Sequence, residues 1–511
     1  MPLILDSSPS PSSPLPSVVE LSPATIRRRE HQEADVVIVG AGILGTSLAV
    51  TLARQNRSVI LLEKSLKEPD RIVGELLQPG GVQALKKLGL RDCLEGLDAI
   101  RVKGYEVIYY GKEVEIPYPL NAGGDDDDRD GGGFEGEKPY SNAKGSGVKR
   151  PEGRSFHHGR FIQQLRAAAM KEENISLIES TVTGTVKDGW TKQVLGVEAE
   201  TKDGRKDVYF GQLTVLADGY ASRFRKEFIT HAPVSKSKFY GLELIDADLP
   251  RPMHGHVVLG EGAPVLLYQI GTRETRALVD VPEGTPSAST ANGGVKGHLR
   301  HVVLPSLPKC VQSSFERALD DGKIRSMPNS WLPPSTQQVP GMILLGDAMN
   351  MRHPLTGGGM TVAFNDVVML RDLLSPEKVP DLGDTARVKQ QMRRFHWRRK
   401  YLTSVINILA QALYSLFAAN DPELKALQLG CFRYFQQGGS CVDGPVGLLA
   451  GIIRRPFVLF YHFFAVAWLA IWLVVRQAPV YRLPWTLLST VGIFWKACVV
   501  IFPFIFSELR S

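Results

Sequence analysis

The sequence feature that most constrains the fold is a glycine-rich turn between a strand and a helix. Residues 34–39 are a short apolar run rich in β-branched side chains, followed by Gly40-x-Gly42-x-x-Gly45 and by a helical pattern through Arg54. In such a turn the first glycine permits the tight bend, the second lets a pyrophosphate approach the backbone, and the third lets helix and strand pack closely. The start of the helix then attracts the phosphates. The motif therefore predicts a dinucleotide site.

The residue that follows the next strand narrows the kind of nucleotide. Residues 58–62 form a second apolar run, and Glu63 follows them directly. A carboxylate at this place can accept hydrogen bonds from a ribose diol, and it would repel a 2′-phosphate. The β-α-β unit therefore favours an unphosphorylated adenosine ribose. It leaves open whether the rest of the dinucleotide is a flavin or a nicotinamide.

Two later apolar strands also end in a turn that carries an aspartate. Residues 213–217 lead into an Asp-Gly pair at Asp218, and residues 342–345 lead into a Gly-Asp pair at Asp347. Open α/β sheets bind ligands at the carboxyl ends of their strands, so Asp347 could accept a hydrogen bond from a sugar-alcohol hydroxyl. The alternative for Asp347 is a helix cap or a turn residue.

Three consecutive glycines, at 357–359, precede a helical pattern that begins near Met360. The start of a helix presents unpaired N–H groups and a partial positive charge. Such a charge would stabilise the negative charge that reduction places on one edge of a flavin ring. A flexible loop is the alternative interpretation of the glycines.

In their order, these segments resemble the aromatic-hydroxylase group of FAD-dependent monooxygenases, although that group often has Asn in place of Thr361. The resemblance rests on the turn at Gly40, on residues 213–223 and on residues 344–360. A narrower resemblance, to the squalene epoxidase family, extends from about residue 34 over nearly the whole chain. The signature of this family contains the stretch with Thr361 as it is written here. The narrower resemblance adds two stretches, Asp70-Arg71-Ile-Val-Gly74-Glu75-Leu-Leu-Gln78-Pro79-Gly80-Gly81 and Phe156-His157-His158-Gly159-Arg160-Phe161.

This resemblance implies FAD as the cofactor, molecular oxygen and squalene as substrates, and 2,3-oxidosqualene for sterol synthesis as the product. It makes Tyr105 an active-site tyrosine and places Gln78 in the stretch associated with it. By composition alone, Tyr105 would be an ordinary strand aromatic, and Arg71 and Arg160 would be surface charges or ion-pair members. The implied flavin contacts are Ile43, Leu44, Glu63, Lys64, Arg71, Leu76, Arg160, Val182, Asp347 and Met360, to which the motifs add Gly40, Gly42, Gly45 and Asp218.

The chemistry implied by the resemblance makes few demands on protein acids and bases. Epoxidation of an isolated alkene needs an electrophilic oxygen atom, which a reduced flavin and oxygen can supply. The protein has to orient the terminal double bond and exclude water, so Tyr105 is expected to position groups rather than to act as an acid. The sequence has no second GxGxxG between a strand and a helix. The resemblance implies that NADPH–cytochrome P450 reductase delivers the electrons.

The chain becomes strongly apolar toward its end. Residues 402–418 are a largely apolar helical stretch, residues 456–475 carry no formal charge, and residues 485–506 contain a single charge, Lys496. Twenty helical residues span roughly the 30 Å of a hydrocarbon core. We therefore expect a helical membrane anchor, with buried soluble helices as the alternative. Whether the helices span the bilayer or form a re-entrant hairpin stays open. The resemblance implies the endoplasmic reticulum membrane, with the catalytic part facing the cytosol.

The predicted fold is α/β, with a discontinuous Rossmann-type FAD domain, an inserted mixed-sheet substrate domain and a C-terminal helical membrane anchor. The Ser- and Pro-rich tail, with no visible secretory signal peptide, and a stretch rich in Asp and Gly are expected to be flexible. The predicted ranges are 1–30 for the tail, 31–104, 148–235 and 336–386 for the FAD domain, 105–120 and 236–335 for the substrate domain, 121–147 for the flexible insertion, and 387–511 for the membrane-associated region.

Composition excludes several other classes of protein. The net charge of +7 comes without the basic and aromatic pattern of a nucleic-acid module, so no nucleic-acid partner is expected. The five cysteines are scattered without a CxxC, and the Asp run at 125–128 lacks the spacing of a calcium loop, so no metal site is expected. The alternatives left open are a membrane-bound flavin monooxygenase of another prenyl or aromatic substrate and a non-catalytic membrane-tethered flavoprotein. A NAD-dependent dehydrogenase is disfavoured by the Asp218 and Asp347 segments.

Overall fold

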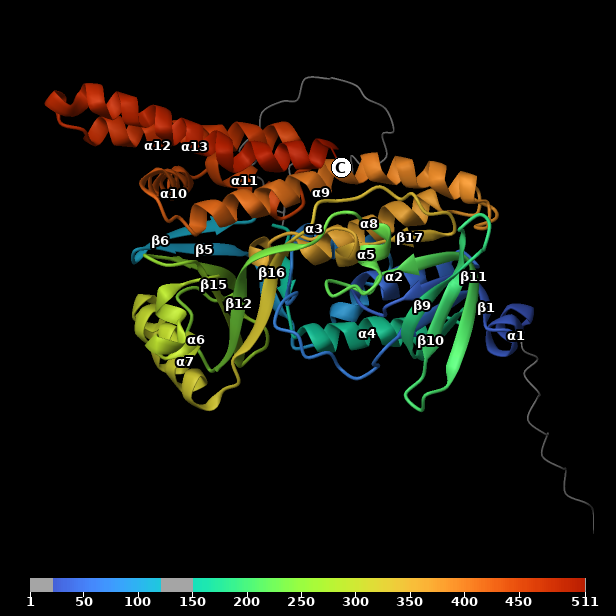
Figure 1. The fold of residues 1–511 in the computed structure, drawn as a ribbon. Coiled ribbons are helices and arrows are strands. Elements are labelled where there is room, and N and C mark those ends of the chain that lie inside the picture. Colours follow the sequence, from blue (N-terminus) through green and yellow to red (C-terminus); the bar gives the residue numbers. More distant parts are fainter. Residues whose placement is uncertain (1–21, 121–149, 511) are drawn as a thin grey trace, which may run out of the picture.

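The strands on either side of the glycine-rich turn form the centre of a large sheet in the computed structural model, which describes residues 22–120 and 150–510 (Figure 1). β1 pairs in parallel with β2 on one side and with β11 on the other, and β11 also pairs in parallel with β17. Residues 36–38 are fully buried, as expected for a parallel strand that is covered on both faces. The strands of this first sheet are β8 (Ile175–Glu179), β2 (Val59–Glu63), β1 (Glu33–Val39), β11 (Lys206–Leu216), β10 (Val194–Glu200), β9 (Thr181–Lys187) and β17 (Met342–Leu344).

Helices on this sheet begin close to the ends of its central strands. α2 (Ile43–Ala53) is buried along its whole length after Ile43, and it packs against α4 (His158–Met170) and α8 (Gly359–Leu373). Because β1, β2, β11 and β17 run in the same direction, their carboxyl ends meet at one edge of the sheet. The glycine turn, Glu63, Asp218 and Asp347 therefore lie along that edge.

The second sheet is mixed and joins strands from distant parts of the chain. β5 pairs in parallel with β13 and antiparallel with β6, while the remaining strand pairs are antiparallel. α6 (Gly294–His298) and α7 (Lys309–Asp321) cover one face of this sheet, and the other face turns toward the C-terminal helices (Figure 1). The strand order is β16 (Arg325–Trp331), β12 (Val234–Ile245), β15 (Glu274–Pro282), β14 (Val265–Gln269), β13 (His254–Leu259), β5 (Gly104–Tyr109) and β6 (Lys112–Pro117).

A small sheet and short helices complete the body between the two large sheets. The small sheet has the order β3 (Leu76–Leu77), β7 (Gly153–Ser155) and β4 (Ile100–Val102). α3 (Pro79–Lys87) follows β3 directly and packs on α8, and α5 (Arg225–Phe228) follows the Asp218 turn. The stretch that carries Gln78 is therefore held between the small sheet and a helix of the first sheet.

The C-terminal helices form a layer over both sheets. α9 (Thr385–Phe417) crosses the molecule from the first sheet to the second, and α10 (Pro422–Phe435) and α11 (Ser440–Leu449) follow beside it (Figure 1). α9 starts well before the apolar stretch that predicted it, because the Asp384 side chain caps it by accepting a hydrogen bond from the Arg387 N–H at 3.0 Å.

The last two helices form an antiparallel hairpin. α12 (Pro456–Gln477) and α13 (Leu483–Arg510) pack against each other, and α13 also packs on α9. Within the described residues, these are the two helices that are long and apolar enough by themselves to cross a membrane. Only 28% of the most apolar stretch of α12 and 22% of that of α13 is buried, so most of both stretches is exposed. That exposure agrees with the membrane anchor predicted from the sequence. The base of the hairpin, where α12 starts and α13 ends, lies against the body.

The expected flexible tail is shorter than predicted. α1 (Pro23–Glu30) lies within the range 1–30, so the prediction of disorder was wrong for residues 23–30. The Ser22 hydroxyl caps this helix, and the buried Arg28 side chain donates to Ser176 Oγ at 3.1 Å and to the Glu173 carbonyl at 2.5 Å. These contacts stabilise the helix, and the composition of the segment gives no indication of them. Residues 1–21 and the predicted insertion at 121–147 lie outside the described residues.

A buried carboxylate fastens the end of the hairpin to α9. The Glu508 carboxylate accepts hydrogen bonds from Ser404 Oγ and from Asn407 Nδ2, each at 2.7 Å, and its carbonyl accepts one from Lys400 Nζ at 2.7 Å. Asn407 Nδ2 also donates to Asn350 Oδ1 at 3.2 Å, in the loop after β17. Hydrogen bonds thus connect the last turn of α13 with the loop that carries Asp347.

We predict that Glu508→Ala destabilises the hairpin base, because two buried donors on α9 lose an acceptor. Asn407 Nδ2 keeps Asn350 Oδ1 as an acceptor, so the expected loss is about 1–3 kcal/mol, mainly from the Ser404 hydroxyl. Thermal unfolding of the detergent-solubilised protein measures this effect. Leu509→Ala, at an exposed position in the same turn, is the matched control. Equal unfolding temperatures for the two variants would contradict the structural role of Glu508.

Candidate active site

A large cavity lies where the carboxyl edge of the first sheet meets the second sheet and α9. It encloses about 1560 Å³, the open space at its mouth included. One part of its wall is rich in backbone and charged groups, and another part, formed by the second sheet and by the loops at Val73 and Leu355, is largely apolar. The polar part includes Gly42, Ile43, Arg71, Asp347, Arg352, Asp366 and Arg399, and the apolar part includes Val73, Val257, Leu266, Leu278, Met327 and Leu355.

Two helices present their N-termini to this cavity. Gly42 precedes α2 and Gly358 precedes α8, and neither helix start has a side-chain cap. Gly42, Ile43 and Leu44 of the first helix line the cavity, as do Gly359 and Met360 of the second. Each helix end has N–H groups without intrahelical partners and a partial positive charge. The cavity can therefore accept negative charge at two separate places.

The glycine turn has the geometry that its sequence predicts. Gly40 has φ +102°, and a Cβ at this residue would lie 2.5 Å from the Ala217 carbonyl oxygen. A Cβ at Gly45 would lie 1.9 Å from the Gly40 carbonyl oxygen, whereas a Cβ at Gly42 would have nothing within 4 Å. Gly40 and Gly45 therefore permit close packing, and Gly42 leaves space beside the cavity for another group.

Glu63 supports the glycine turn and does not line the cavity. Its Oε2 accepts a hydrogen bond from the Ala41 N–H at 2.8 Å and lies 3.5 Å from Arg166 Nη2. Its Oε1 accepts a longer hydrogen bond, of 3.3 Å, from the Ser65 N–H. The carboxylate is thus fixed at the carboxyl end of β2, next to the turn that it helps to shape.

Besides Glu63, three residues suggested by the family resemblance lie away from the cavity wall. Lys64 and Arg160 are exposed, and Val182 is buried in the core of the first sheet. Asp218 is also outside the wall, although its neighbours Ala217 and Gly219 line it. Its Oδ2 accepts a hydrogen bond from the Arg223 N–H at 3.1 Å, and burial raises the pKa of this carboxyl group. Asp218 therefore shapes the turn in this structure.

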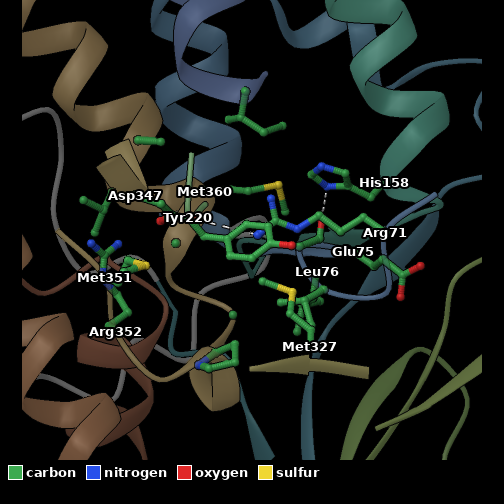
Figure 2. Close-up of a pocket in the computed structure, with 18 of the residues that line it drawn as sticks. Arg71, Glu75, Leu76, His158, Tyr220, Met327, Asp347, Met351, Arg352 and Met360 are labelled. Atoms are coloured by element: carbon green, nitrogen blue, oxygen red, sulfur yellow. Dashed lines mark hydrogen bonds and ion pairs between the residues drawn. The ribbon is translucent and has the colours of Figure 1, made fainter. Parts of the chain in front are cut away.

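Arg71, Tyr220 and Asp347 come together on the polar side of the cavity (Figure 2). Arg71 Nη2 lies 3.7 Å from Asp347 Oδ2, and the Arg71 guanidinium lies 5.3 Å from the centre of the Tyr220 ring. Arg71 Nε is buried without a hydrogen-bond partner among the described residues. A buried donor without a partner costs free energy, so this side of the cavity is suited to an acceptor from a bound molecule.

The two predicted catalytic residues are in direct contact. Gln78 is fully buried, and its Nε2 donates to the Tyr105 hydroxyl oxygen and, at 2.8 Å, to the Thr356 carbonyl. The Tyr118 hydroxyl donates to Gln78 Oε1 at 2.7 Å. Tyr105 lines the cavity, whereas Gln78 stands behind it. Burial raises the pKa of Tyr105, so the phenol stays neutral, and Gln78 fixes its position.

Sequence reasoning missed a buried ion pair beside the cavity, in which Glu75 lines the wall. Glu75 Oε1 and Oε2 each accept a hydrogen bond of 2.8 Å from Arg276 on β15, and Tyr268 donates to Glu75 at 3.4 Å. Burial raises the pKa of Glu75 to about 7, against the opposing effect of Arg276. Glu75 lies within the stretch 70–81 that supports the family resemblance. Arg276 and Tyr268 stand in ordinary strand patterns, which give no signal of this contact.

His158 also lines the cavity, although the sequence does not indicate a role for its side chain. Its Nδ1 lies 2.8 Å from the Gly74 carbonyl oxygen, and the ring is buried at the start of α4 (Figure 2). Burial, with a smaller contribution from Arg71, lowers the pKa of His158 to about 3. The ring is therefore neutral and holds the loop at Gly74, where φ is +90°.

Comparison with known proteins places the chain in a family. The family model described as squalene epoxidase matches residues 210–488. Squalene epoxidase erg1 of Aspergillus fumigatus is 60% identical over 488 residues, which cover 96% of each chain, and squalene monooxygenase of Mus musculus is 42% identical, covering 94% of this chain and 78% of the relative. The chain belongs to the squalene epoxidase family. The recognition made from the four sequence stretches is thus confirmed.

Solved structures show that this squalene epoxidase family member has the fold of flavin-dependent enzymes. PqsL of Pseudomonas aeruginosa, described as a probable FAD-dependent monooxygenase, has a TM-score of 0.60 at 20% identity over 76% of this chain and 97% of that chain. The flavin-dependent brominase Bmp2 has a TM-score of 0.64 at 15% identity over 85% and 98% of the two chains. At these identities the comparison concerns the fold alone, and it confirms the predicted α/β class.

A buried histidine connects the second sheet, the loop after β17 and α9. The His353 ring stacks on Tyr414 of α9, with centroids 3.9 Å apart, and its Nδ1 accepts a hydrogen bond from the Leu355 N–H at 3.2 Å. Burial lowers the pKa of His353 to about 3. Its Nε2 is buried without a hydrogen-bond partner among the described residues and lies 4.0 Å from Asp280 Oδ1 on β15. Protonation would therefore place a buried charge where these three parts meet.

We predict that His353 makes the protein sensitive to acid. Its pKa of about 3 in the folded state lies below the roughly 6.5 of an unfolded histidine. The unfolded chain therefore binds the proton first, and stability is lost as the pH falls from 6.5 toward 3. Between pH 7 and pH 5 the expected loss from this one group is about 2 kcal/mol.

Thermal unfolding at pH 7 and pH 5 measures the effect. The unfolding temperature of His353→Gln should fall less between the two pH values than that of the unsubstituted protein. His301→Gln, at an exposed histidine, should behave like the unsubstituted protein. If both variants show the same pH dependence, His353 is not the sensitive group.

Proposed function

We propose that this chain is an FAD-dependent squalene epoxidase, which converts squalene into 2,3-oxidosqualene for sterol biosynthesis with molecular oxygen and electrons from NADPH. The observation that carries the proposal is the 60% identity with a squalene epoxidase over 96% of both chains. The cavity supports it, because it joins a polar end with two helix N-termini to an apolar end on the second sheet.

The residues at the polar end fit FAD. The open space at Gly42 and the uncapped start of α2 suit a pyrophosphate, because a phosphate is favoured by the positive end of a helix. The uncapped start of α8 at Met360 suits the edge of the flavin that becomes negative on reduction. Arg71, Leu76 and Asp347 complete this part of the wall. When bound, the flavin supplies the oxygen-activating redox chemistry that side chains lack.

The other proposed flavin residues act from behind the wall or stay predictions. Gly40, Gly45, Glu63 and Asp218 would hold the two turns in shape, since their contacts are with backbone groups of those turns. The direct flavin contacts implied for Lys64, Arg160 and Val182 stay predictions from the family resemblance.

The apolar end of the cavity suits a hydrocarbon substrate. Leu266, Leu278, Met327 and neighbouring apolar side chains make most of this part of the wall, beside His256 and Tyr268 of the same sheet, and they need no hydrogen bond from a hydrocarbon. Tyr105 lies at this wall and is held by Gln78. We assign to Tyr105 the positioning of the reacting end of the substrate beside the flavin, and to Gln78 the positioning of Tyr105. A neutral, fixed phenol orients groups and helps to exclude water without transferring a proton.

The proposed electron donor and location follow from the family and the hairpin. We assign electron delivery to NADPH–cytochrome P450 reductase, as membership of the squalene epoxidase family implies. The exposed apolar hairpin supports attachment to the endoplasmic reticulum membrane, with the catalytic body on the cytosolic side. A substrate dissolved in the bilayer could then enter from the membrane side.

A product assay tests the function directly. Detergent-solubilised protein is supplied with FAD, NADPH, a P450 reductase and squalene, and the extract is analysed by mass spectrometry. We expect 2,3-oxidosqualene, which should be absent without oxygen. If the flavin is bound and reduced but squalene is recovered unchanged, the assigned substrate is wrong, and another membrane-soluble alkene or aromatic has to be sought.

We predict that Tyr105→Phe lowers turnover while FAD stays bound. The substitution removes the hydroxyl that accepts the Gln78 hydrogen bond but keeps the ring in the wall. A loss of roughly 10- to 100-fold in kcat corresponds to about 1.4–2.7 kcal/mol. Turnover and flavin absorbance per mole of protein are measured together. Loss of flavin from this variant would show that the assigned role is wrong.

We predict that Glu63→Ala weakens FAD retention. The substitution removes the acceptor of the Ala41 N–H and so loosens the glycine turn. A loss of about 1–3 kcal/mol corresponds to roughly 5- to 150-fold weaker binding. Quenching of flavin fluorescence on titration with the apoprotein measures the dissociation constant. Glu63→Gln, which keeps a hydrogen-bond acceptor, should lose less; equal losses would mean that the charge, and not the hydrogen bond, matters.

A further inference from the structure

The first half of α9 has an outer face of unusual composition. The exposed positions recur at the spacing of one helix face. α9 contains no Asp or Glu over its whole length. The residues that we call the α9 outer face are Lys389, Gln390, Arg393, Arg394, Trp397, Arg398 and Tyr401, all of them exposed.

The opposite side of the same helix is fully engaged with the body. Arg399 forms a buried ion pair with Asp366 of α8, at 2.9 and 3.2 Å, and both residues line the cavity. Phe395 is buried in the core of the first sheet. Packing and the buried ion pair on this side thus hold α9 against the body.

Two large aromatic side chains stand among the basic residues. Trp397 is 64% exposed and Tyr401 is 65% exposed, one turn apart. Lys400 Nζ lies 4.6 Å from the centre of the Trp397 ring. Trp and Tyr are enriched where protein meets the boundary between lipid and water, because their rings are apolar and their N–H or O–H groups are polar. A basic helix face with such residues is typical of helices that lie on a membrane surface.

This face continues into the membrane hairpin. Lys400 Nζ donates to the Glu508 carbonyl at 2.7 Å, so the last turn of α13 lies beside the Trp397 turn of α9. Phe506 and Leu509 in that last turn are exposed as well. In Figure 1 the hairpin and the first half of α9 lie on the same side of the molecule, away from the two sheets.

We propose that the α9 outer face binds the headgroups of anionic lipids and extends the membrane contact of the hairpin across the catalytic body. The proposal rests on the proposed membrane attachment. Juxtamembrane basic residues are attracted to anionic lipids, and the lipid surface is the occupant that matches both the charge and the aromatic residues. Since Arg399 on the same helix lines the cavity, one helix diameter, about 10 Å, would separate the cavity from the lipid.

Vesicle binding of the full-length protein tests the proposal. Arg393, Arg394 and Arg398 are replaced together by Gln. In the matched control, three exposed lysines outside α9, Lys226 on α5, Lys238 on β12 and Lys323 after α7, are replaced by Gln. Binding is measured by flotation with vesicles of phosphatidylcholine alone and of phosphatidylcholine with phosphatidylserine. The arginine variant should bind the anionic vesicles about 100-fold more weakly than the control. On neutral vesicles the two should bind alike.

An aromatic pair of variants tests the same surface independently. Trp397→Ala should weaken binding to both kinds of vesicle, whereas Trp190→Ala, at a 94% exposed site on another surface, should not. The proposal is overturned if the arginine variant and its charge-matched control bind anionic vesicles equally. It is also overturned if that variant binds normally but accepts electrons poorly from a P450 reductase, since the face would then dock a protein. Squalene turnover is not measured in the vesicle assay, so an error in the assigned substrate would leave this result unchanged.

Discussion

The parallel pairing of β1 with β2 and β11, and of β11 with β17, is the constraint on which the cavity depends. Strands that run in the same direction deliver all their following loops to one edge. The glycine turn at Gly40, the carboxylate of Glu63, the Asp218 turn and the Asp347 turn meet there for this reason. Antiparallel pairing at any of these places would send one loop to the opposite edge, and the two uncapped helix starts could not face one cavity.

Buried polar contacts join the other parts of the molecule to that edge. Glu75 and Arg276 connect the segment before α3 to the second sheet, and Arg399 and Asp366 connect α9 to α8. Glu508 connects the end of the hairpin to α9. Buried ion pairs contribute little net stability against apolar replacements, but the loss of one partner is costly. These contacts therefore fix how the sheets and the helical layer sit against one another, which packing of apolar surfaces alone leaves less defined.

The cavity has a polar end and an apolar end, which match the dinucleotide and the hydrocarbon that the chemistry has to bring together. The first sheet and α8 offer helix ends and charges to a dinucleotide, while the second sheet offers an apolar wall to a hydrocarbon. Tyr105 belongs to the second sheet but is held by Gln78, which lies between the small sheet and α3. The helical layer above both sheets carries the apolar hairpin. Through Arg399 of α9, the same layer also borders the cavity.

The sequence by itself determined the β-α-β unit, the apolar helices and the family. Each depends on residues that are neighbours in the chain. The β-α-β unit needs the close approach that only glycine allows at Gly40 and Gly45, and the helices follow from long apolar runs that are unfavourable in water. Among the flavin contacts that the family resemblance implies, Ile43, Leu44 and Met360 line the cavity. The helix at residues 23–30 was missed, because the contacts of Arg28 that hold it come from about 150 positions later.

Only the tertiary structure decided which distant side chains meet. The pairing of Glu75 with Arg276 joins residues 201 positions apart, and that of Glu508 with Asn407 joins residues 101 apart. In the sequence each of these is an ordinary polar residue in a strand or helix. Their roles arise because two sheets and a helix pack at fixed distances, and because a polar group that packing buries has to find its partner within that same interior.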